Sequence, residues 1–133
     1  AMAAGRTSLL GGVSFANRPS VQIEIAKAEA LLRSARAYFY EVTDEAAARC
    51  LAGEILGDKD VAMLRLAATN AAHSGAKVVH SIYTIAGTTG IYAGTRIGQA
   101  LQDSLVIPQH AFISEAMWQH WGAALLGVPP AGL

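Results

Sequence analysis

The chain has 133 residues, of which 53% are apolar and 15% are charged, which is enough for a single domain with a hydrophobic core. Ten Lys and Arg balance ten Asp and Glu, and this zero net charge argues against a nucleic-acid partner that would need a basic face. The single cysteine, Cys50, excludes a disulfide framework and a thiolate-rich metal site within one chain.

The location of the protein is expected to be cytoplasmic, because a lone cysteine fits a reducing compartment. No stretch approaches the roughly 18 uninterrupted apolar residues of a membrane span, so no membrane partner is expected. Residues 1–5 lack the charged and apolar regions of a secretory signal. Ala1, which precedes Met2, is expected to be a residue added in cloning.

The first predicted element is a long helix that begins near Pro19 and Ser20, after a leader over residues 1–18. Pro suits the first turn of a helix, and Ser can cap it. Residues 43–46 are expected to break or kink this helix, and a second helical piece follows over residues 48–56. Before the break, apolar residues recur at steps of three and four, as on one face of an amphipathic helix, at Ile25, Ala28, Leu32, Ala35, Phe39 and Val42.

The clearest pattern predicts a long helix after Gly57, with Asp58 as its N-cap. The helix is expected to end at residues 87–90. A stripe of this length is typical of a helix packed along its whole length against another helix. Its apolar and small residues alternate at steps of three and four over more than three heptads, at Val61, Leu64, Ala68, Ala71, Gly75, Val78, Ile82 and Ile85.

Two shorter helices follow a connector over residues 91–95. The first is predicted from Arg96 to Ile107, where Pro108 interrupts it. The last is predicted over residues 111–126.

The predicted fold is all-α. Ala, the best helix former, occurs 27 times against 4 Pro. Short loops between long helices imply antiparallel neighbours, and therefore an up-and-down four-helix bundle. The bundle domain is expected to span residues 19–127, with a C-terminal tail over residues 128–133.

General motifs for chemistry are few. Glycines cluster between Gly87 and Gly98, but no predicted strand precedes them, so neither a dinucleotide site nor a phosphate-binding loop is expected. His73 and His80 are seven residues apart and could share a helix face. No carboxylate stands three or four residues away to complete a metal site, so no metal is expected.

A set of short motifs occurs in one order between residues 64 and 127: Leu64-Arg65-Leu66-Ala67-Ala68-Thr69, Ile85-Ala86-Gly87-Thr88-Thr89, Ile91-Tyr92-Ala93-Gly94-Thr95, Asp103, Gln109-His110 and Gly122-Ala123-Ala124-Leu125-Leu126-Gly127. In order and spacing they resemble the C-terminal helical domain of the acyl-CoA dehydrogenase superfamily, and most of all its flavin-dependent monooxygenase branch. Residues 19–42 are similar in pattern to the first long helix of that domain. The resemblance implies a four-helix bundle, in agreement with the periodicity.

The resemblance also implies that the chain is about a third of a flavoenzyme subunit. In that family an N-terminal helical domain and a middle β domain precede the bundle. Flavin lies between the middle domain and the bundles, with a neighbouring subunit contributing. The chain would then help to complete a site for FAD or FMN, with those two domains as its partners, and it would not be active alone.

One departure from the family pattern bears on the reaction. Acyl-CoA dehydrogenases commonly carry Ile-Tyr-Glu-Gly-Thr at the connector, and the Glu is the base that removes a proton. Here that position is Ala93, whose methyl group cannot accept a proton. Some members place the base on the first helix, where Glu24, Glu29 and Glu41 lie. The monooxygenase branch uses reduced flavin and oxygen and does not need that Glu, so a monooxygenase-like or otherwise divergent activity is favoured.

The resemblance assigns roles to three residues. His110 would sit near the flavin and donate a hydrogen bond to the oxygenated ring, and the alternative is a histidine bonded to backbone or to a neighbouring subunit. Thr95 and Gln99 match positions that touch flavin, and the alternative for them is a helix N-cap and a surface amide. Gln99 and Gln102 stand where branch members often carry Arg, which removes two cations that could pair with flavin phosphates.

A second interpretation is a standalone helical oligomerisation module without catalysis. It is motivated by Met2 as a possible start and by the two missing arginines. A bundle that normally packs against sister domains would expose large apolar faces when alone. Self-association to a dimer or tetramer is therefore expected under either interpretation.

Overall fold

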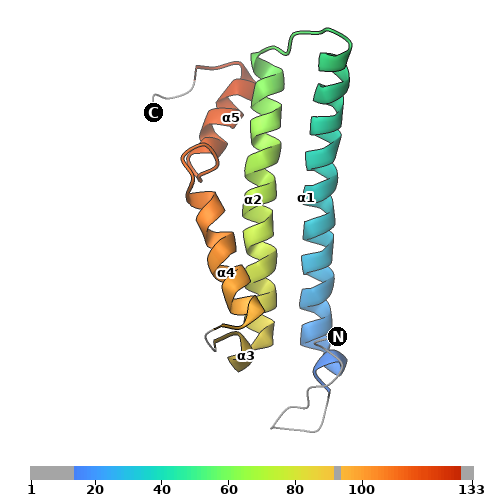
Figure 1. Cartoon of the computed structure of the whole chain (residues 1–133), viewed down its shortest axis with the longest axis vertical. Coiled ribbons are helices and arrows are strands. Elements are labelled where there is room, and N and C mark those ends of the chain that lie inside the picture. Colours follow the sequence, from blue (N-terminus) through green and yellow to red (C-terminus); the bar gives the residue numbers. More distant parts are fainter. Residues whose placement is uncertain (1–13, 92–93, 130–133) are drawn as a thin grey trace.

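Two long antiparallel helices and a column of shorter ones make up the computed structural model (Figure 1), which describes residues 14–91 and 94–129. These residues contain no β-strand, so the all-α prediction is confirmed. Helix α2 lies between α1 and the third column, in which α4 and α5 follow one another along α2 (Figure 1). The elements are η1 (Phe15–Asn17), α1 (Pro19–Leu51), α2 (Asp58–Ala86), α3 (Thr88–Ile91), α4 (Arg96–Val106), η2 (Ile107–Gln109) and α5 (Met117–Leu126).

Helix α1 packs on α2 through small side chains that repeat every seven residues. Val21, Ala28 and Ala35 are each only 6% exposed. Alanine in such a repeat lets two helix backbones approach closely, and a seven-residue spacing keeps the same face toward the partner along the helix. The same spacing reaches Arg49 in the last turn of α1, where a charged contact to α2 replaces the apolar ones.

The break expected over residues 43–46 is wrong, because α1 continues to Leu51 without interruption. The Thr43 hydroxyl donates a hydrogen bond of 2.8 Å to the Phe39 carbonyl oxygen, one turn earlier. Thr43 therefore satisfies its polar group inside the helix and does not cap a new one. The chain leaves the helix at Gly53, whose φ of +83° lies in the left-handed region that favours glycine.

Helix α2 begins one residue earlier than the N-cap prediction implies. Asp58, expected to be the cap, is the first helical residue, and Gly57 is the N-cap. The Asp60 carboxylate accepts a hydrogen bond of 2.9 Å from the Gly57 N–H. An acidic group in this first turn also interacts favourably with the positive end of the helix dipole. The helix ends at Ala86, as predicted, and the short α3 then begins within the expected end region.

The last helix begins at Met117, so the prediction that it starts at residue 111 is wrong. In a helix the Ile113 carbonyl would accept from the Met117 N–H. Instead the ring of His73, on α2, hydrogen-bonds that carbonyl at 2.8 Å, and the Met117 N–H donates to Ser114 O at 2.9 Å. A contact from a distant helix thus replaces the local helical pattern over residues 111–116.

A compact apolar cluster joins α2 to α5. Ala62 of α2 is 2% exposed, and Met117 and Trp121 of α5 are 4% and 9% exposed. Leu66 and Ala124 pack against this cluster. Contacts with α2, this cluster among them, position the third column, because within the described ranges neither α4 nor α5 contacts α1.

Gly75 lies in the middle of α2, and its replacement by Ala is expected to stabilise the fold. A Cβ added there meets no atom within 4 Å, and the position borders a hollow of about 350 Å³ beside Leu32 and Phe39. Glycine inside a helix costs about 1 kcal/mol relative to Ala. Gly75→Ala should therefore raise the free energy of unfolding by about that amount in urea denaturation. A lower value would show that α1 and α2 need closer contact here than the structure indicates.

Within the described ranges no helix combines the length and the apolar character that crossing a membrane requires. Residues 1–13 of the expected leader and residues 130–133 of the expected tail lie outside the described residues. Residues 15–17 of the leader form η1, and the Gln22 side chain donates to Ala16 O at 2.9 Å. The domain boundaries stay predictions.

Candidate functional site

Two of the three candidate residues lie at the N-terminal end of α4. Thr95 is the N-cap, and its Oγ1 accepts a hydrogen bond of 3.2 Å from the Gly98 N–H. Its own hydroxyl proton has no acceptor among the described residues and can be donated outward. Gln99 is exposed, and its Nε2 donates to Asp103 at 2.8 Å, which leaves the amide oxygen as an acceptor.

A hollow of about 300 Å³ lies beside this first turn of α4. The ring of Tyr83, from α2, forms part of its lining together with Gly94, Gly98 and Gln99. Gly90 lies so close to that ring that an added Cβ would come within 2.9 Å of its Cε2 atom. Glycine at position 90 therefore allows the backbone to pack closely against an aromatic ring.

These groups suit one part of a flavin nucleotide. The Thr95 hydroxyl and the N–H groups at the start of α4 are donors that phosphate and ribose oxygens accept. The Tyr83 ring and the neighbouring glycines allow a flat group to approach closely. However, about 300 Å³ is the lower end of the volumes of small-molecule sites. The chain can therefore offer only part of a site for FAD or FMN.

The third candidate, His110, follows η2 at the other end of α4. Its Nδ1 atom accepts a hydrogen bond of 3.3 Å from the Phe112 N–H. In a neutral imidazole this bond places the proton on Nε2, which makes Nε2 a donor. The side chain is exposed, and Nε2 has no partner among the described residues.

The structure does not bring the three candidates together in one pocket. Helix α4 has 11 residues and is therefore roughly 16 Å long at 1.5 Å per residue, and both α4 and η2 lie between Thr95 and His110. A ligand that touches both would have to extend along α4. The observed contacts also agree with the alternatives to flavin contact. Thr95 caps a helix, Gln99 is a surface amide and His110 bonds to backbone. Each residue nevertheless keeps a free donor or acceptor.

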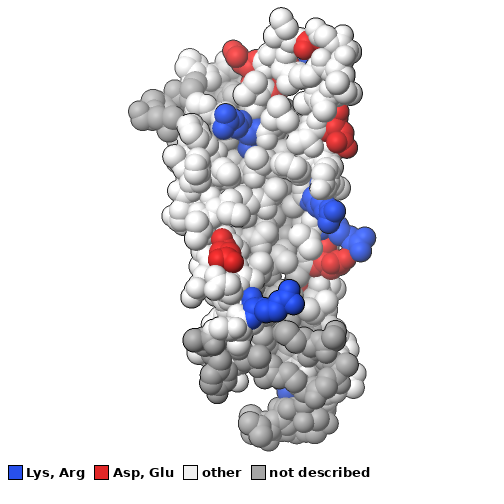
Figure 2. All heavy atoms as spheres, in the orientation of Figure 1, with Lys and Arg blue, Asp and Glu red and all other residues white. Residues whose placement is uncertain are grey.

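A larger cleft of about 960 Å³ lies over α2, between α1 and the third column. Leu31 of α1 and Leu105 and Pro108 of the third column give it apolar walls, and Lys77 and His80 of α2 add polar groups. On the face drawn in Figure 2, charged side chains are few and leave most of the surface uncharged. None of the three candidate residues lines this cleft.

The two histidines of α2 differ in their surroundings. The His73 side chain is 17% exposed and is bonded to Ile113, whereas His80 is exposed. In the part of the chain that the structure describes, no three His, Cys, Asp or Glu side chains gather in the manner of a metal site. Tyr92 and Ala93, the connector residues on which the choice of reaction depends, lie outside the described residues.

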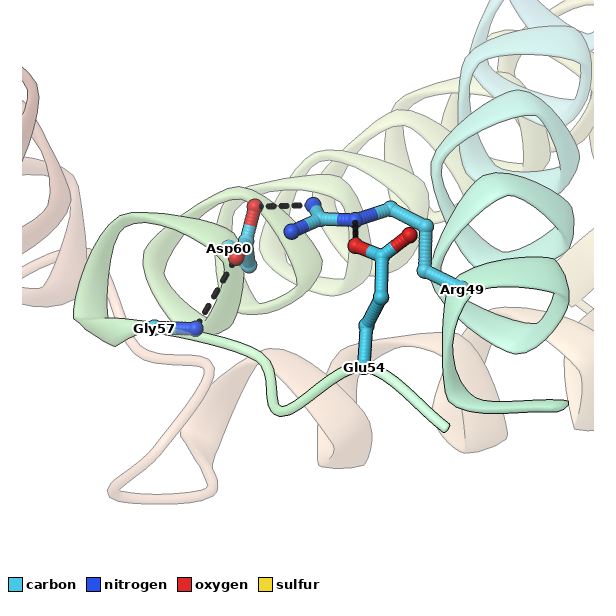
Figure 3. Close-up of polar contacts among 4 residues, drawn as sticks. All are labelled: Arg49, Glu54, Gly57 and Asp60. Carbon is cyan, nitrogen blue, oxygen red and sulfur yellow. Dashed lines mark hydrogen bonds and ion pairs between the residues drawn. The ribbon is translucent and has the colours of Figure 1, made fainter. Parts of the chain in front are cut away.

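Sequence reasoning missed a charged network where α1 meets α2 (Figure 3). The Arg49 Nη1 atom lies 2.7 Å from Asp60 Oδ1, and its Nε atom lies 2.8 Å from Glu54 Oε2. The hydrogen bond from Arg49 and then that from the Gly57 N–H hold the pKa of Asp60 below its ordinary value of 3.8. The same carboxylates raise the pKa of Arg49. The only local sequence signal for this network was Asp60, an acidic residue three positions after Gly57.

Replacing Asp60 by Asn should lower the melting temperature at neutral pH and matter less in acid. The pKa of this carboxyl is depressed in the folded state, so its stabilising contribution is complete above the ordinary value of 3.8. The contribution is lost as the pH falls from there through the folded-state pKa. Thermal unfolding of both proteins from pH 7 to pH 2 should show their melting temperatures converging below about pH 4. A constant gap would mean that Asp60 acts through shape and not through charge.

Three matches with known proteins bear on the function. The sequence matches the family model described as acyl-CoA dehydrogenase, C-terminal domain, over residues 1–115. It is 41% identical over 129 residues to an indole-3-acetate monooxygenase of Pseudomonas putida, which covers 97% of this chain and 33% of that protein. It is 35% identical over 130 residues to an indole-3-acetate monooxygenase of Acinetobacter baumannii, with 98% and 33% covered. The chain thus spans about a third of the length of these relatives.

Proposed function

Because the chain belongs to the family of acyl-CoA dehydrogenase C-terminal domains, we propose that it forms the C-terminal helical domain of a longer flavin-dependent oxidoreductase. The observation that carries this proposal is the 41% identity to an enzyme of which the chain matches only a third. In such a protein the remaining two thirds would supply the N-terminal helical domain and the middle β domain. The wide apolar cleft over α2 supports a role beside other domains.

A monooxygenase-like reaction is the better proposal than dehydrogenation. Both relatives carry the name of a monooxygenase, and Ala93 stands where dehydrogenases of the family carry their base. Alanine has no group that could take a proton from a substrate. The oxidation of indole-3-acetate, or of a similar aromatic acid, is the reaction to test first.

The three candidate residues would then serve the flavin in different ways. Thr95 and Gln99 would hold polar atoms of FAD or FMN at the start of α4, through the free hydroxyl proton and the free amide oxygen. Bound flavin would supply the electrons that activate oxygen. His110 would donate a hydrogen bond from Nε2 to the group that gains negative charge there. The exposed Cys50 fits a reducing compartment, which supports a cytoplasmic location.

The test is a chimera in which this chain replaces the matching third of the Pseudomonas putida enzyme. The chimera, supplied with reduced flavin, should consume indole-3-acetate at a rate within about tenfold of the parent enzyme, because a mismatch of about 1.4 kcal/mol at the new domain contacts is tolerable. A second chimera that carries an unrelated helical bundle of equal length is the matched control. If the first chimera shows native helicity and melts cooperatively but oxidises indole-3-acetate no faster than the control, the proposed reaction is wrong.

A role in assembly is the second candidate, and exposed apolar side chains favour it. Leu105, Ile107 and Phe112 of the third column are between 50% and 57% exposed, and Ile25 and Leu32 of α1 are each 44% exposed. Large apolar side chains that are exposed together on a surface mark contacts with other protein. The chain should therefore sediment as a dimer or tetramer at tens of micromolar in equilibrium centrifugation. A monomer at that concentration would contradict both the assembly role and the standalone-module interpretation.

A further inference from the structure

The turn over residues 110–116, named here the His110 turn, is attached to α2 at two points. The His73 Nε2 atom lies 2.8 Å from the Ile113 carbonyl oxygen, across 40 residues of sequence. Eight residues earlier on α2, the Arg65 guanidinium lies over the Phe112 ring, 5.4 Å from its centroid. Both attachments come from a long and well-packed helix, so α2 fixes where this turn lies.

The stronger of the two attachments is the one made by His73. Its side chain is 17% exposed, so a lost hydrogen bond there would leave the Ile113 carbonyl without a partner in a part-buried place. The ring of His73 also packs edge-on against Trp118, with 5.7 Å between centroids, which fixes its orientation. The nearby Glu115 carboxylate lies 3.7 Å from Nδ1, but it is 86% exposed and adds little.

Hydrogen bonds within the His110 turn fix the position of the His110 imidazole. The Phe112 N–H donates to His110 Nδ1 at 3.3 Å, and the Ile113 N–H donates to His110 O at 2.9 Å. These two bonds belong to the residues that Arg65 and His73 attach to α2. The position of the His110 ring, and the location of its proton on Nε2, therefore depend on the contact between His73 and Ile113.

We infer that His73 is a positioning residue, which holds the His110 turn on α2 and thereby keeps His110 in the tautomer that donates from Nε2. The Ile113 carbonyl oxygen can only accept a hydrogen bond. The His73 Nε2 atom must therefore donate it, so His73 itself carries its proton on Nε2. The inference that this matters for oxidation rests on the proposed function of His110. The inference that His73 holds the turn on α2 does not depend on that proposed function.

The first test uses the whole 133-residue chain and needs no cofactor. His73→Leu should speed hydrogen exchange at the amides of Ile113 and Met117 by about tenfold, which corresponds to the loss of about one hydrogen bond. Nitrogen-15 spectra of His110 should also lose the single Nε2–H signature. His73→Gln, whose amide can donate to the same carbonyl, should restore both properties. His80→Leu, on the same helix but without a hydrogen bond, ion pair or ring contact to the described turn, is the matched control.

Equal acceleration of exchange along α1 and α2 in His73→Leu would show a general loss of stability and would overturn the inference. An unchanged spectrum of His110 would overturn it as well. A second test in the chimera separates the inference from the proposed function. There His73→Leu should lower oxidation, by no more than His110→Leu does, and the double variant should be no slower than His110→Leu alone. If the chimera lacks activity while the exchange results hold, the proposed function fails and the positioning role stands.

Discussion

Replacement of Trp121 by Ala should lower the free energy of unfolding by about 3–5 kcal/mol. Trp121 is 9% exposed and packs with Ala62 and Met117 in the cluster that joins α5 to α2. The substitution removes a large apolar surface and leaves a cavity that two helices cannot close by a small movement. Since a domain of this kind is stable by about 5–15 kcal/mol, the loss is a large fraction of the total.

The measurement is urea denaturation followed by circular dichroism, with a drop in melting temperature of roughly 10–20 °C as a second sign. Trp121→Phe is the matched control. The Nε1 atom of Trp121 is buried without a hydrogen-bond partner in the described part of the chain, so Phe keeps most of the packing and removes an unpaired donor. Phe should therefore lose less than about 1.5 kcal/mol. Equal losses for Ala and Phe would mean that packing of the ring is not what holds α5 on α2.

His110→Leu in the chimera should slow the oxidation of indole-3-acetate by about 100-fold, the effect of removing one hydrogen-bond donor from developing charge. The side chain is exposed and its only bond is to the backbone of its own turn, so Leu should change stability little. Flavin affinity should stay within about threefold, because the interaction is stronger in the transition state than in the ground state. The rates are compared with reduced flavin at saturating indole-3-acetate.

Gln119→Leu in the same chimera is the control, since that side chain is also exposed and lines neither the cleft over α2 nor the hollow at the start of α4. A rate within about twofold of the chimera is expected for it. If His110→Leu reacts as fast as Gln119→Leu, His110 is the backbone-bonded histidine of the structural alternative, and its assignment to the flavin is withdrawn.

The long helices could be predicted from sequence because their signal is local. The stripe from Val61 to Ile85 places α2 to within three residues at its start and one residue at its end. The false break in α1 has a local cause that sequence reasoning misjudged, since Thr43 can bond backwards within a helix as well as cap a new one. Asp60, and not Asp58, supplies the carboxylate that bonds the N–H of the N-cap Gly57, and the two carboxylates belong to the same turn.

Contacts across long stretches of sequence could not be predicted. His73 bonds Ile113 over 40 residues, and nothing in the periodicity around either residue marks the pair. The start of α5 was misplaced for the same reason. It was predicted at residue 111, but the helix begins at Met117, after the turn that His73 contacts. Thr95, Gln99 and His110 came from resemblance, because a site that other domains complete would leave no complete motif in this chain. Their roles toward a flavin stay predictions.

The central claim is that residues of this chain complete a flavin site, and the affinity of the chimera for flavin tests it most directly. FAD and FMN are each titrated by fluorescence into the chimera, into a Thr95→Val/Gln99→Leu variant and into a Gln119→Leu control on the exposed face of α5. Loss of two polar contacts should weaken binding of the preferred flavin by at least about tenfold in the double variant and leave the control unchanged. Equal affinities in all three proteins, each melting as a folded protein, would contradict the account.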